Sequence, residues 1–382
     1  MGKILLTISL ILTCLLGFGQ PTGANEPVLI SGKSYNTYVF KPSTYADSVS
    51  KKYPVIIMLN GLGEDVNNLS TINSFGPNAM ILGGWSGTQK LGDSTFEFIT
   101  ASLQKPSDGS AGPSTLIRQI DTVLTRYRVD TNRIYIMGLS AGGQKFFGMV
   151  CMDPITSYNY LKFTATVMWS SNTSIPGGTF DSLRQWTRIG GGIMYAVGNE
   201  DVGSNRRTAQ SVIDAANAGR PDAGVGYTWT SPPWPTAGHG GWNYGFDSSY
   251  KDPTLNINTY EYLLGHTKQP YASAGQSVIN ITESTATLNG ITRQYAWGYN
   301  GRGVTTTTWT KKSGGSATIT NPNSDTTTVT GLTTGTYVFT LTSANASGGL
   351  SASKDVTVNV VANNQGAMFI KTRGRKLFIT AD

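Results

Sequence analysis

The alternation of strand-like and helix-like segments up to about residue 269 constrains the fold of this chain more than any other feature. The runs at 53–61, 133–137, 163–169 and 192–198 are short and almost continuously apolar, as expected for strands buried on both faces of a sheet. Segments with helical periodicity alternate with these runs, at 114–128, after Ser140, at 205–219 and at 255–265. This pattern predicts an α/β domain with a mostly parallel sheet over residues 26–269.

The pattern changes after the stretch HTKQPYASAGQ, where short threonine- and valine-rich runs alternate with turn residues. Roughly seven such strands, at spacings near ten residues, indicate an all-β immunoglobulin-like sandwich over residues 273–362, with Trp309 in its core. Residues 363–382 resemble one hairpin that turns at Gly374. Because a lone hairpin is only marginally stable, it must pack on something or begin a further unit.

The first 19 residues, MGKILLTISLILTCLLGFG, are organised like a secretory signal peptide. Lys3 precedes a short apolar run, and Gly17 and Gly19 form a small-x-small site, so we expect cleavage after Gly19. The run is too short for a membrane span, and no other segment is apolar enough to be one. The mature chain is therefore expected to be secreted, either extracellular or periplasmic. It would keep one cysteine, Cys151, which has no disulfide partner.

The composition argues against several kinds of partner. Charged residues make up only 13% of the chain, the net charge is +7, and no basic stripe is interleaved with aromatic residues, so nucleic acid is not expected. The two histidines are far apart in the sequence, which does not suit a His-rich metal site, and no metal or cofactor is implied. The sequence does not indicate an oligomeric state.

Ser140 lies between Gly138 and Gly142 in a G-x-S-x-G pattern. Since 46 of the 382 residues are glycine, this pattern would occur by chance roughly 0.5 times in such a chain. Here, however, an apolar strand precedes the serine and a helix follows it, which is the strand–turn–helix context of a nucleophile elbow. The context therefore predicts that Ser140 is a catalytic nucleophile.

A nucleophilic serine needs a base, and the base needs a carboxylate that orients it. His266 follows the last predicted helix, where a histidine favours the helix dipole, so a structural role is expected for it. His239 lies in the glycine-rich loop TAGHGGW and is predicted to be the base. Asp201 or Glu200, just beyond a predicted buried strand, would orient it. Asp201 is preferred for its Gly-x-x-Asp spacing, and the alternative for either residue is to cap the following helix.

Backbone N–H groups must stabilise the oxyanion that such a reaction forms. The predicted donors are the N–H of Ala141, directly after the nucleophile, and that of Leu62 or Gly61 in the loop after the first buried strand. Along the chain the nucleophile precedes the acid and the acid precedes the base. This is the order of the α/β-hydrolase fold and differs from the orders in chymotrypsin and subtilisin.

The motifs VIIMLNGLGED, YRVDTNRIYIMGLSAGG, AVGNEDV and AGHGGW together resemble the secreted esterase branch of the α/β-hydrolases. That branch contains family 1 carbohydrate esterases (feruloyl and acetyl xylan esterases), polyhydroxyalkanoate depolymerases and proteins described as predicted peptidases. The resemblance covers about residues 26–269 and implies that Ser140 is the nucleophile, His239 the general base and acid, and Asp201 its orienting partner. Asn60 departs from the pattern, which usually has histidine there, but Asn can also hold the loop by hydrogen bonds. The C-terminal half resembles the PKD or immunoglobulin-like modules of secreted bacterial hydrolases.

These features predict a secreted bacterial serine esterase that hydrolyses acyl or feruloyl esters on plant polysaccharide through an acyl-enzyme. A peptidase or polyester depolymerase of the same fold is an alternative, as is a non-catalytic extracellular binding protein on a hydrolase scaffold. The acyl and alcohol specificity cannot be read from the residues. Trp85, Trp169 and Trp242 fall near loops of the predicted active edge, where they either form an aromatic platform for substrate or pack loops. The sandwich is expected to act as a spacer or to attach the enzyme to a polymer or surface.

Overall fold

The structure is a computed structural model. It describes residues 20–64, 71–104, 112–151, 163–171, 180–188, 191–196, 201, 206–219, 226–229, 239, 242–251, 256–268, 271–293, 305–345, 351–362, 369–373 and 376–380. The predicted signal peptide (1–19), Glu200 and Gly374 lie outside the described residues. Within them, no helix is both long enough and apolar enough to cross a membrane.

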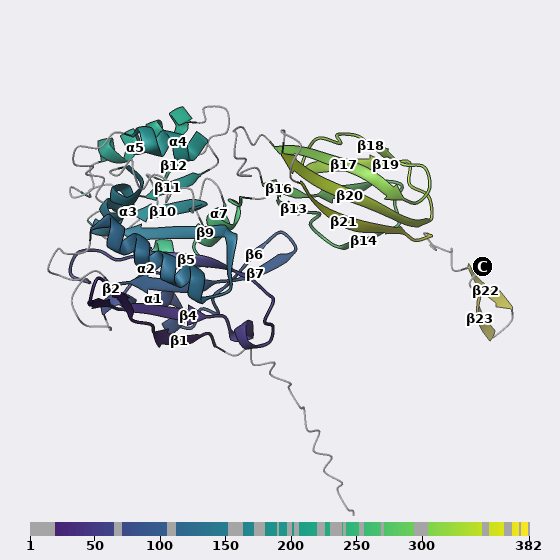
Figure 1. Ribbon diagram of the computed structural model, residues 1–382. Coiled ribbons are helices and arrows are strands. Elements are labelled where there is room, and N and C mark those ends of the chain that lie inside the picture. Colours follow the sequence, from purple (N-terminus) through teal and green to yellow (C-terminus); the bar gives the residue numbers. More distant parts are fainter. Residues whose placement is uncertain are drawn as a thin grey trace, which may run out of the picture.

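The first part of the chain is built on a sheet of eight strands in the order β1-β4-β8-β5-β9-β10-β11-β12 (Figure 1). Their bounds are β1 Thr22–Asn25, β4 Thr37–Lys41, β5 Tyr53–Leu59, β8 Ile99–Leu103, β9 Val129–Leu139, β10 Ala165–Trp169, β11 Gly192–Ala196 and β12 Gly226–Trp229. β4 is antiparallel to both of its neighbours, and from β8 to β12 every pair is parallel. This strand order is that of the α/β-hydrolase fold, so the predicted fold class is confirmed.

Helices cover both faces of this sheet. Their bounds are α1 Gly76–Leu82, α2 Pro113–Arg126, α3 Ala141–Cys151, α4 Asp181–Arg188, α5 Arg206–Gly219, α6 Trp242–Phe246 and α7 Thr259–Leu264, with 3-10 turns at Ser43–Ala46 and Thr71–Asn73. Alternate residues of the strands supply two separate apolar cores. In β9, Ile134 and Ile136 belong to the core under α2 to α5, whereas Tyr135 and Met137 belong to the core under α6 and α7. Burial on both faces explains why these strands read as continuous apolar runs.

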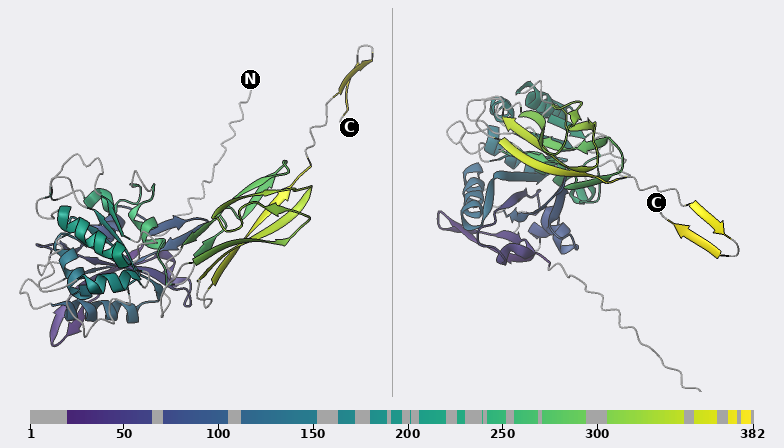
Figure 2. Two further views of the ribbon diagram at one scale, coloured as in Figure 1. Left: turned by 90° about the horizontal axis from the view of Figure 1, so that it is seen from above. Right: turned by 90° about the vertical axis from the view of Figure 1, so that its right-hand side faces the viewer.

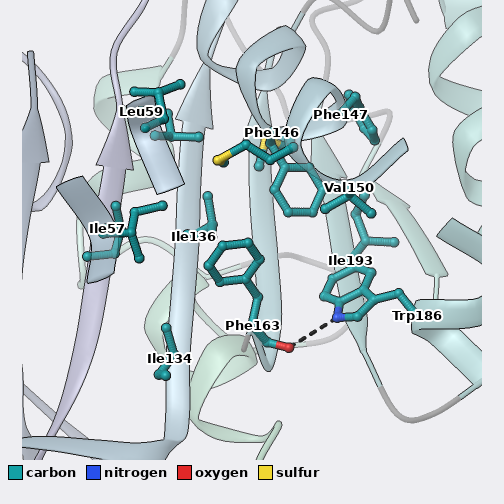
Figure 3. Close-up of a cluster of buried hydrophobic side chains, with 14 of the residues drawn as sticks. Ile57, Leu59, Ile134, Ile136, Phe146, Phe147, Val150, Phe163, Trp186 and Ile193 are labelled. Carbon is teal, nitrogen blue, oxygen red and sulfur yellow. Dashed lines mark hydrogen bonds between the residues drawn. The ribbon is translucent and has the colours of Figure 1, made fainter. Parts of the chain in front are cut away.

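The first of these cores anchors α3, the helix that begins directly after Ser140 (Figure 3). Phe146 of α3 packs edge-on against Trp186 of α4, with ring centroids 5.7 Å apart. The buried indole of Trp186 donates a hydrogen bond to the backbone oxygen of Phe163 at 3.0 Å, so its polar group is satisfied. The position of α3 relative to the sheet is thus set by aromatic packing below the predicted site.

Two small hairpins extend from the first part of the chain. They consist of β2 Val28–Ile30 with β3 Lys33–Tyr35, and of β6 Thr88–Leu91 with β7 Ser94–Glu97.

The second part of the chain is an all-β sandwich, as predicted, and lies beside the first (Figures 1 and 2). One sheet has the order β14-β21-β20-β17, the other has the order β15-β19-β18, and β13 pairs with β16. The bounds are β13 Tyr271–Ser273, β14 Val278–Ile281, β15 Ala286–Asn289, β16 Ile291–Arg293, β17 Thr305–Ser313, β18 Thr318–Ile319, β19 Thr326–Thr330, β20 Gly335–Asn345 and β21 Ser351–Val360. Trp309 is buried in the core of the sandwich, as expected, and its indole N–H donates to the backbone oxygen of Asp325 at 3.2 Å. Towards the C-terminus, β22 Phe369–Arg373 and β23 Lys376–Thr380 form an antiparallel pair (Figure 2).

The tip of the β6–β7 hairpin contacts the sandwich. The backbone N–H of Asp93 donates to Oγ of Ser273 at 3.1 Å, and this hydroxyl donates to Oδ1 of Asp93 at 2.7 Å. The other carboxylate oxygen of Asp93 lies 3.7 Å from Nζ of Lys354. Ile291 of the sandwich packs against the apolar core that includes Leu91. The two parts of the chain therefore meet through polar and apolar contacts as well as through the connecting segment.

Candidate active site

Ser140 occupies the turn between β9 and α3, and its backbone is in the left-handed region, with φ at 49°. A residue with a side chain adopts this conformation only at a cost in free energy, so its presence points to a constraint. The N–H of Ser140 donates to the backbone oxygen of Trp169 at 3.0 Å, and the Ser140 carbonyl accepts from Gly143 at 3.2 Å. The strained turn is therefore held at both of its backbone polar groups.

The two glycines of the G-x-S-x-G pattern are required by close packing at this turn. A Cβ atom on Gly142 would lie 2.0 Å from the backbone oxygen of Leu59, so α3 begins in direct contact with the end of β5. A Cβ atom on Gly138 would lie 2.8 Å from Sδ of Met168 in the neighbouring strand. The pattern thus has a steric reason, which is the close passage of strand and helix.

The structure brings Ser140, His239 and Asp201 together in one line of hydrogen bonds. Nε2 of His239 lies 2.8 Å from Oγ of Ser140, and Nδ1 lies 3.0 Å from each carboxylate oxygen of Asp201. A carboxylate at Nδ1 favours the tautomer with its proton there, which leaves Nε2 free to accept the proton of the serine hydroxyl. The arrangement can therefore remove a proton from Ser140.

The three side chains differ in their exposure. The side chain of Asp201 is completely buried, and that of His239 is 40% exposed. A buried carboxylate is costly unless it is paired, and the imidazole N–H supplies the partner. Asp201 lies beyond the carboxyl end of β11, where the sites of parallel sheets assemble, as predicted.

His266 lies elsewhere. It is 4% exposed, and its Nδ1 lies 2.9 Å from the backbone oxygen of Tyr262, one turn earlier in α7. A Cβ atom on Gly192, the first residue of β11, would lie 2.2 Å from its Nε2. His266 therefore packs at the amino end of a strand whose carboxyl end leads to Asp201. The structural role expected for His266 is confirmed.

The loop after β5, which holds the predicted oxyanion donors, passes beside the nucleophile. A Cβ atom on Gly61 would lie 3.4 Å from Cβ of Ser140. The N–H of Gly61 is engaged, because it donates to Oε2 of Glu64 at 2.7 Å. Of the two alternatives for the second donor this favours Leu62 over Gly61, with Ala141 as the first donor.

Asn60 holds this loop, as its substitution for the usual histidine suggested. It is completely buried, and its Nδ2 lies 3.4 Å from the backbone oxygen of Leu103 and 3.5 Å from that of Ile72. These distances are long for hydrogen bonds.

Trp169 and Trp85 pack inside the molecule. Trp169 is 3% exposed, and its ring meets that of Phe246 edge-on at 6.2 Å. Trp85 is partly buried against Tyr260 of α7, with ring centroids 4.3 Å apart, and its indole N–H donates to Thr88. The structure thus supports the packing role that the sequence left open for these two tryptophans.

Trp242, at the start of α6, lies beside the predicted base. Its ring is perpendicular to that of His239, with centroids 5.0 Å apart, and it also meets Phe75 edge-on at 5.9 Å. Both aromatic residues are partly buried. The sequence did not indicate Phe75, because it stands in a glycine- and serine-rich stretch without periodicity.

Comparisons with known proteins agree with this architecture. Residues 274–360 match a family model that describes a PKD domain, and the solution structure of the PKD domain from the KIAA 1837 protein is 31% identical (TM-score 0.18, covering 23% of this chain and 83% of that one). A thermostable esterase is 15% identical (TM-score 0.44, covering 65% of this chain and 63% of that one). A ferulic acid esterase is 16% identical (TM-score 0.39, covering 62% of this chain and 99% of that one).

No curated protein matches the chain in sequence. The assignment of the first part therefore rests on its strand order and connections. The chain combines an α/β-hydrolase fold with a PKD domain at residues 274–360.

Proposed function

We propose that this protein is a serine esterase that hydrolyses carboxylic esters through an acyl-enzyme. The observation that carries the proposal is the line of hydrogen bonds from Asp201 through His239 to Ser140, at a turn with φ of 49°. Oγ of Ser140 attacks the ester carbonyl carbon while Nε2 of His239 takes its proton. The buried Asp201 keeps the proton on Nδ1 and stabilises the imidazolium that forms.

The second half of the reaction uses the same groups. The imidazolium of His239 donates its proton to the leaving oxygen, the alcohol departs, and the acyl group stays on Ser140. Water then attacks the acyl carbonyl as His239 takes its proton, and the carboxylic acid leaves with Ser140 restored. The N–H groups of Ala141 and Leu62 stabilise the negative oxygen in both halves.

The proposed substrates are acyl or feruloyl esters on plant polysaccharide. Trp242 and Phe75 support an aromatic or apolar substituent, because two partly buried rings beside His239 offer apolar surface next to the reacting bond. The proposal includes export from a bacterial cell by the signal peptide predicted in residues 1–19. The sandwich is then a spacer or an attachment to the polymer.

A panel of substrates tests the proposal. The purified protein is expected to hydrolyse 4-nitrophenyl acetate and methyl ferulate, to release acetate from acetylated xylan, and to leave a peptide amide intact. A fluorophosphonate should label Ser140, as located by mass spectrometry of the digested protein. Faster cleavage of the amide than of any ester would indicate a peptidase, and neither turnover nor labelling would indicate a binding protein.

The contribution of the aromatic pair is tested in the same assays. The variant Trp242→Ala should raise KM for methyl ferulate by about tenfold, because the aromatic acyl group loses one buried ring contact. Its KM for ethyl acetate, which has no ring, should change much less. Equal changes with both esters would show that Trp242 does not contact the acyl group.

A further inference from the structure

The peptide group that joins Asn60 to Gly61 is held at both ends by charged side chains. Its carbonyl oxygen accepts a hydrogen bond from Nζ of Lys145 at 2.9 Å, and its N–H donates to Oε2 of Glu64 at 2.7 Å. Hydrogen bonds with a charged partner are stronger than those between neutral groups. We call Lys145 and Glu64 together the peptide clamp.

The clamp connects the nucleophile turn to the neighbouring loop. Lys145 belongs to α3, the helix that begins directly after Ser140. The clamped peptide lies at Gly61, where a Cβ atom would be 3.4 Å from Cβ of Ser140. Glu64 is only 8% exposed, so its hydrogen bond to the loop is shielded from water. A change in the clamp therefore acts on backbone groups next to the reacting serine.

The loop needs such a restraint, because its other anchors are weak. The side-chain hydrogen bonds of Asn60 are 3.4 and 3.5 Å long. Gly61 has no side chain and is therefore the residue type with the greatest backbone freedom. The side chain of Leu62 is 85% exposed and contributes little packing. Without the clamp, rotation of the Asn60–Gly61 peptide would change the direction of the next N–H, that of Leu62.

We propose that Lys145 and Glu64 are positioning residues, which fix the Asn60–Gly61 peptide so that the N–H of Leu62 points, with that of Ala141, at the oxyanion. The inference rests on the proposed esterase function and deepens it. Because Glu64 occupies the N–H of Gly61, that group is not a donor to the oxyanion.

The proposal makes a specific kinetic prediction. Preorganised oxyanion donors act on the transition state and contribute little to binding of the ester itself. Removal of one donor costs about 10²–10³ in kcat, so misdirecting one should cost about 10–100-fold. KM should stay within about threefold of its original value, since ground-state contacts are kept.

The test uses Glu64→Ala and Lys145→Met in the full chain, with 4-nitrophenyl acetate. Each variant should lose about 10–100-fold in kcat, and affinity for an arylboronic acid, which forms a tetrahedral adduct on the serine, should fall by a similar factor. The double variant should lose little more than the worse single variant, because both side chains act on one peptide. Glu64→Gln and Lys145→Arg keep an acceptor and a donor, so they should retain more activity and also report on the clamp if the first pair folds poorly.

Lys312 and Asp355 provide a matched control. They form an ion pair on the sandwich, with Nζ 2.6 Å from Oδ2, and Lys312→Met with Asp355→Ala should leave kcat unchanged. Clamp variants with the original kcat and boronate affinity would overturn the inference while the esterase proposal stands, and so would a rise in KM alone. A parent protein that neither hydrolyses esters nor reacts with fluorophosphonate at Ser140 would overturn the esterase proposal and the clamp's role with it.

Discussion

Nδ1 of His239 lies 3.0 Å from both carboxylate oxygens of Asp201, whose side chain is completely buried, whereas the histidine is 40% exposed. The carboxylate is thus shielded from water while the imidazole stays accessible to a substrate on its other side. Burial strengthens the interaction between the two groups, because water does not screen it. This pairing sets the tautomer on which the proposed proton transfer depends.

Replacement of Asp201 by Asn should therefore abolish most of the activity without unfolding the protein. The amide can donate to Nδ1, which favours the wrong tautomer, and the same change in a serine protease lowers kcat by about 10⁴. Ester hydrolysis and melting temperature measured together check this. Asp47→Asn, at an exposed turn, is the control that should behave like the parent protein. Activity of Asp201→Asn near that of Asp47→Asn would mean that Asp201 does not orient the base.

Ser140→Ala should leave a folded protein that hydrolyses esters at least about 10³-fold more slowly, because the members of a triad act as one unit. Turnover of 4-nitrophenyl acetate and labelling by fluorophosphonate provide the measurement. Ser249→Ala, whose hydroxyl bonds only to Asp247 among the described residues, is the control and should keep full activity. Turnover by Ser140→Ala within about tenfold of the parent would refute the nucleophile assignment.

The two histidines should respond differently to substitution. His239→Asn is expected to remove activity, whereas His266→Asn should keep activity and lose about 1–3 kcal/mol of unfolding free energy, because it leaves a buried hydrogen bond unmade. Unfolding in urea and ester turnover separate the two effects. Equal losses of turnover in both variants would contradict the choice between them.

Activity should also depend on pH through the base. An imidazole that already carries a proton cannot accept the serine proton, so turnover should fall as the pH drops below about 7 and be regained as it rises. Initial rates between pH 5 and 8 measure the profile, and circular dichroism at each pH checks that the fold persists. A rate that rises on acidification would exclude an imidazole base.

Gly142→Ala should damage the protein more than other glycine substitutions. The new methyl group would lie 2.0 Å from the backbone oxygen of Leu59, and neither backbone can move without displacing α3 or β5, so a loss of about 3 kcal/mol is expected. At Gly112, where a Cβ atom meets nothing within 4 Å, Ala should change stability by less than about 1 kcal/mol. Urea unfolding of both variants is the measurement, and equal stabilities would refute the steric explanation.

A chain that ends near Gln269 should keep its activity on a small soluble ester, because Ser140, Asp201 and His239 all precede that point. The structure adds an expected loss of stability, since the tip of the β6–β7 hairpin would lose the contacts of Asp93 with Ser273 and Lys354. Melting temperature and turnover of 4-nitrophenyl acetate distinguish the two effects. A folded truncated protein without turnover would show that the sandwich helps to build the site.

Local patterns in the sequence were sufficient for the fold and for the choice of residues at the site. Continuous apolar runs such as 53–59 report burial on both faces, so they predicted the parallel sheet, and a strand, a Gly-flanked serine and a helix predicted the turn at Ser140. These features depend on residues close together in the chain, whose periodicity and turn chemistry can be read directly. The selection of His239 over His266 used the same local reasoning.

The surroundings of individual side chains were decided only by the tertiary structure. Ser140 and His239 are 99 positions apart, and Lys145 and Asn60 are 85 apart, so packing of the sheet and of α3 is needed to bring each pair within hydrogen-bonding distance. Burial in the core separated Trp169 from Trp242, although the two looked equivalent in the sequence. A residue's type and its neighbours in the chain indicate what it can do, but its partners are set by contacts between segments that are distant in the sequence.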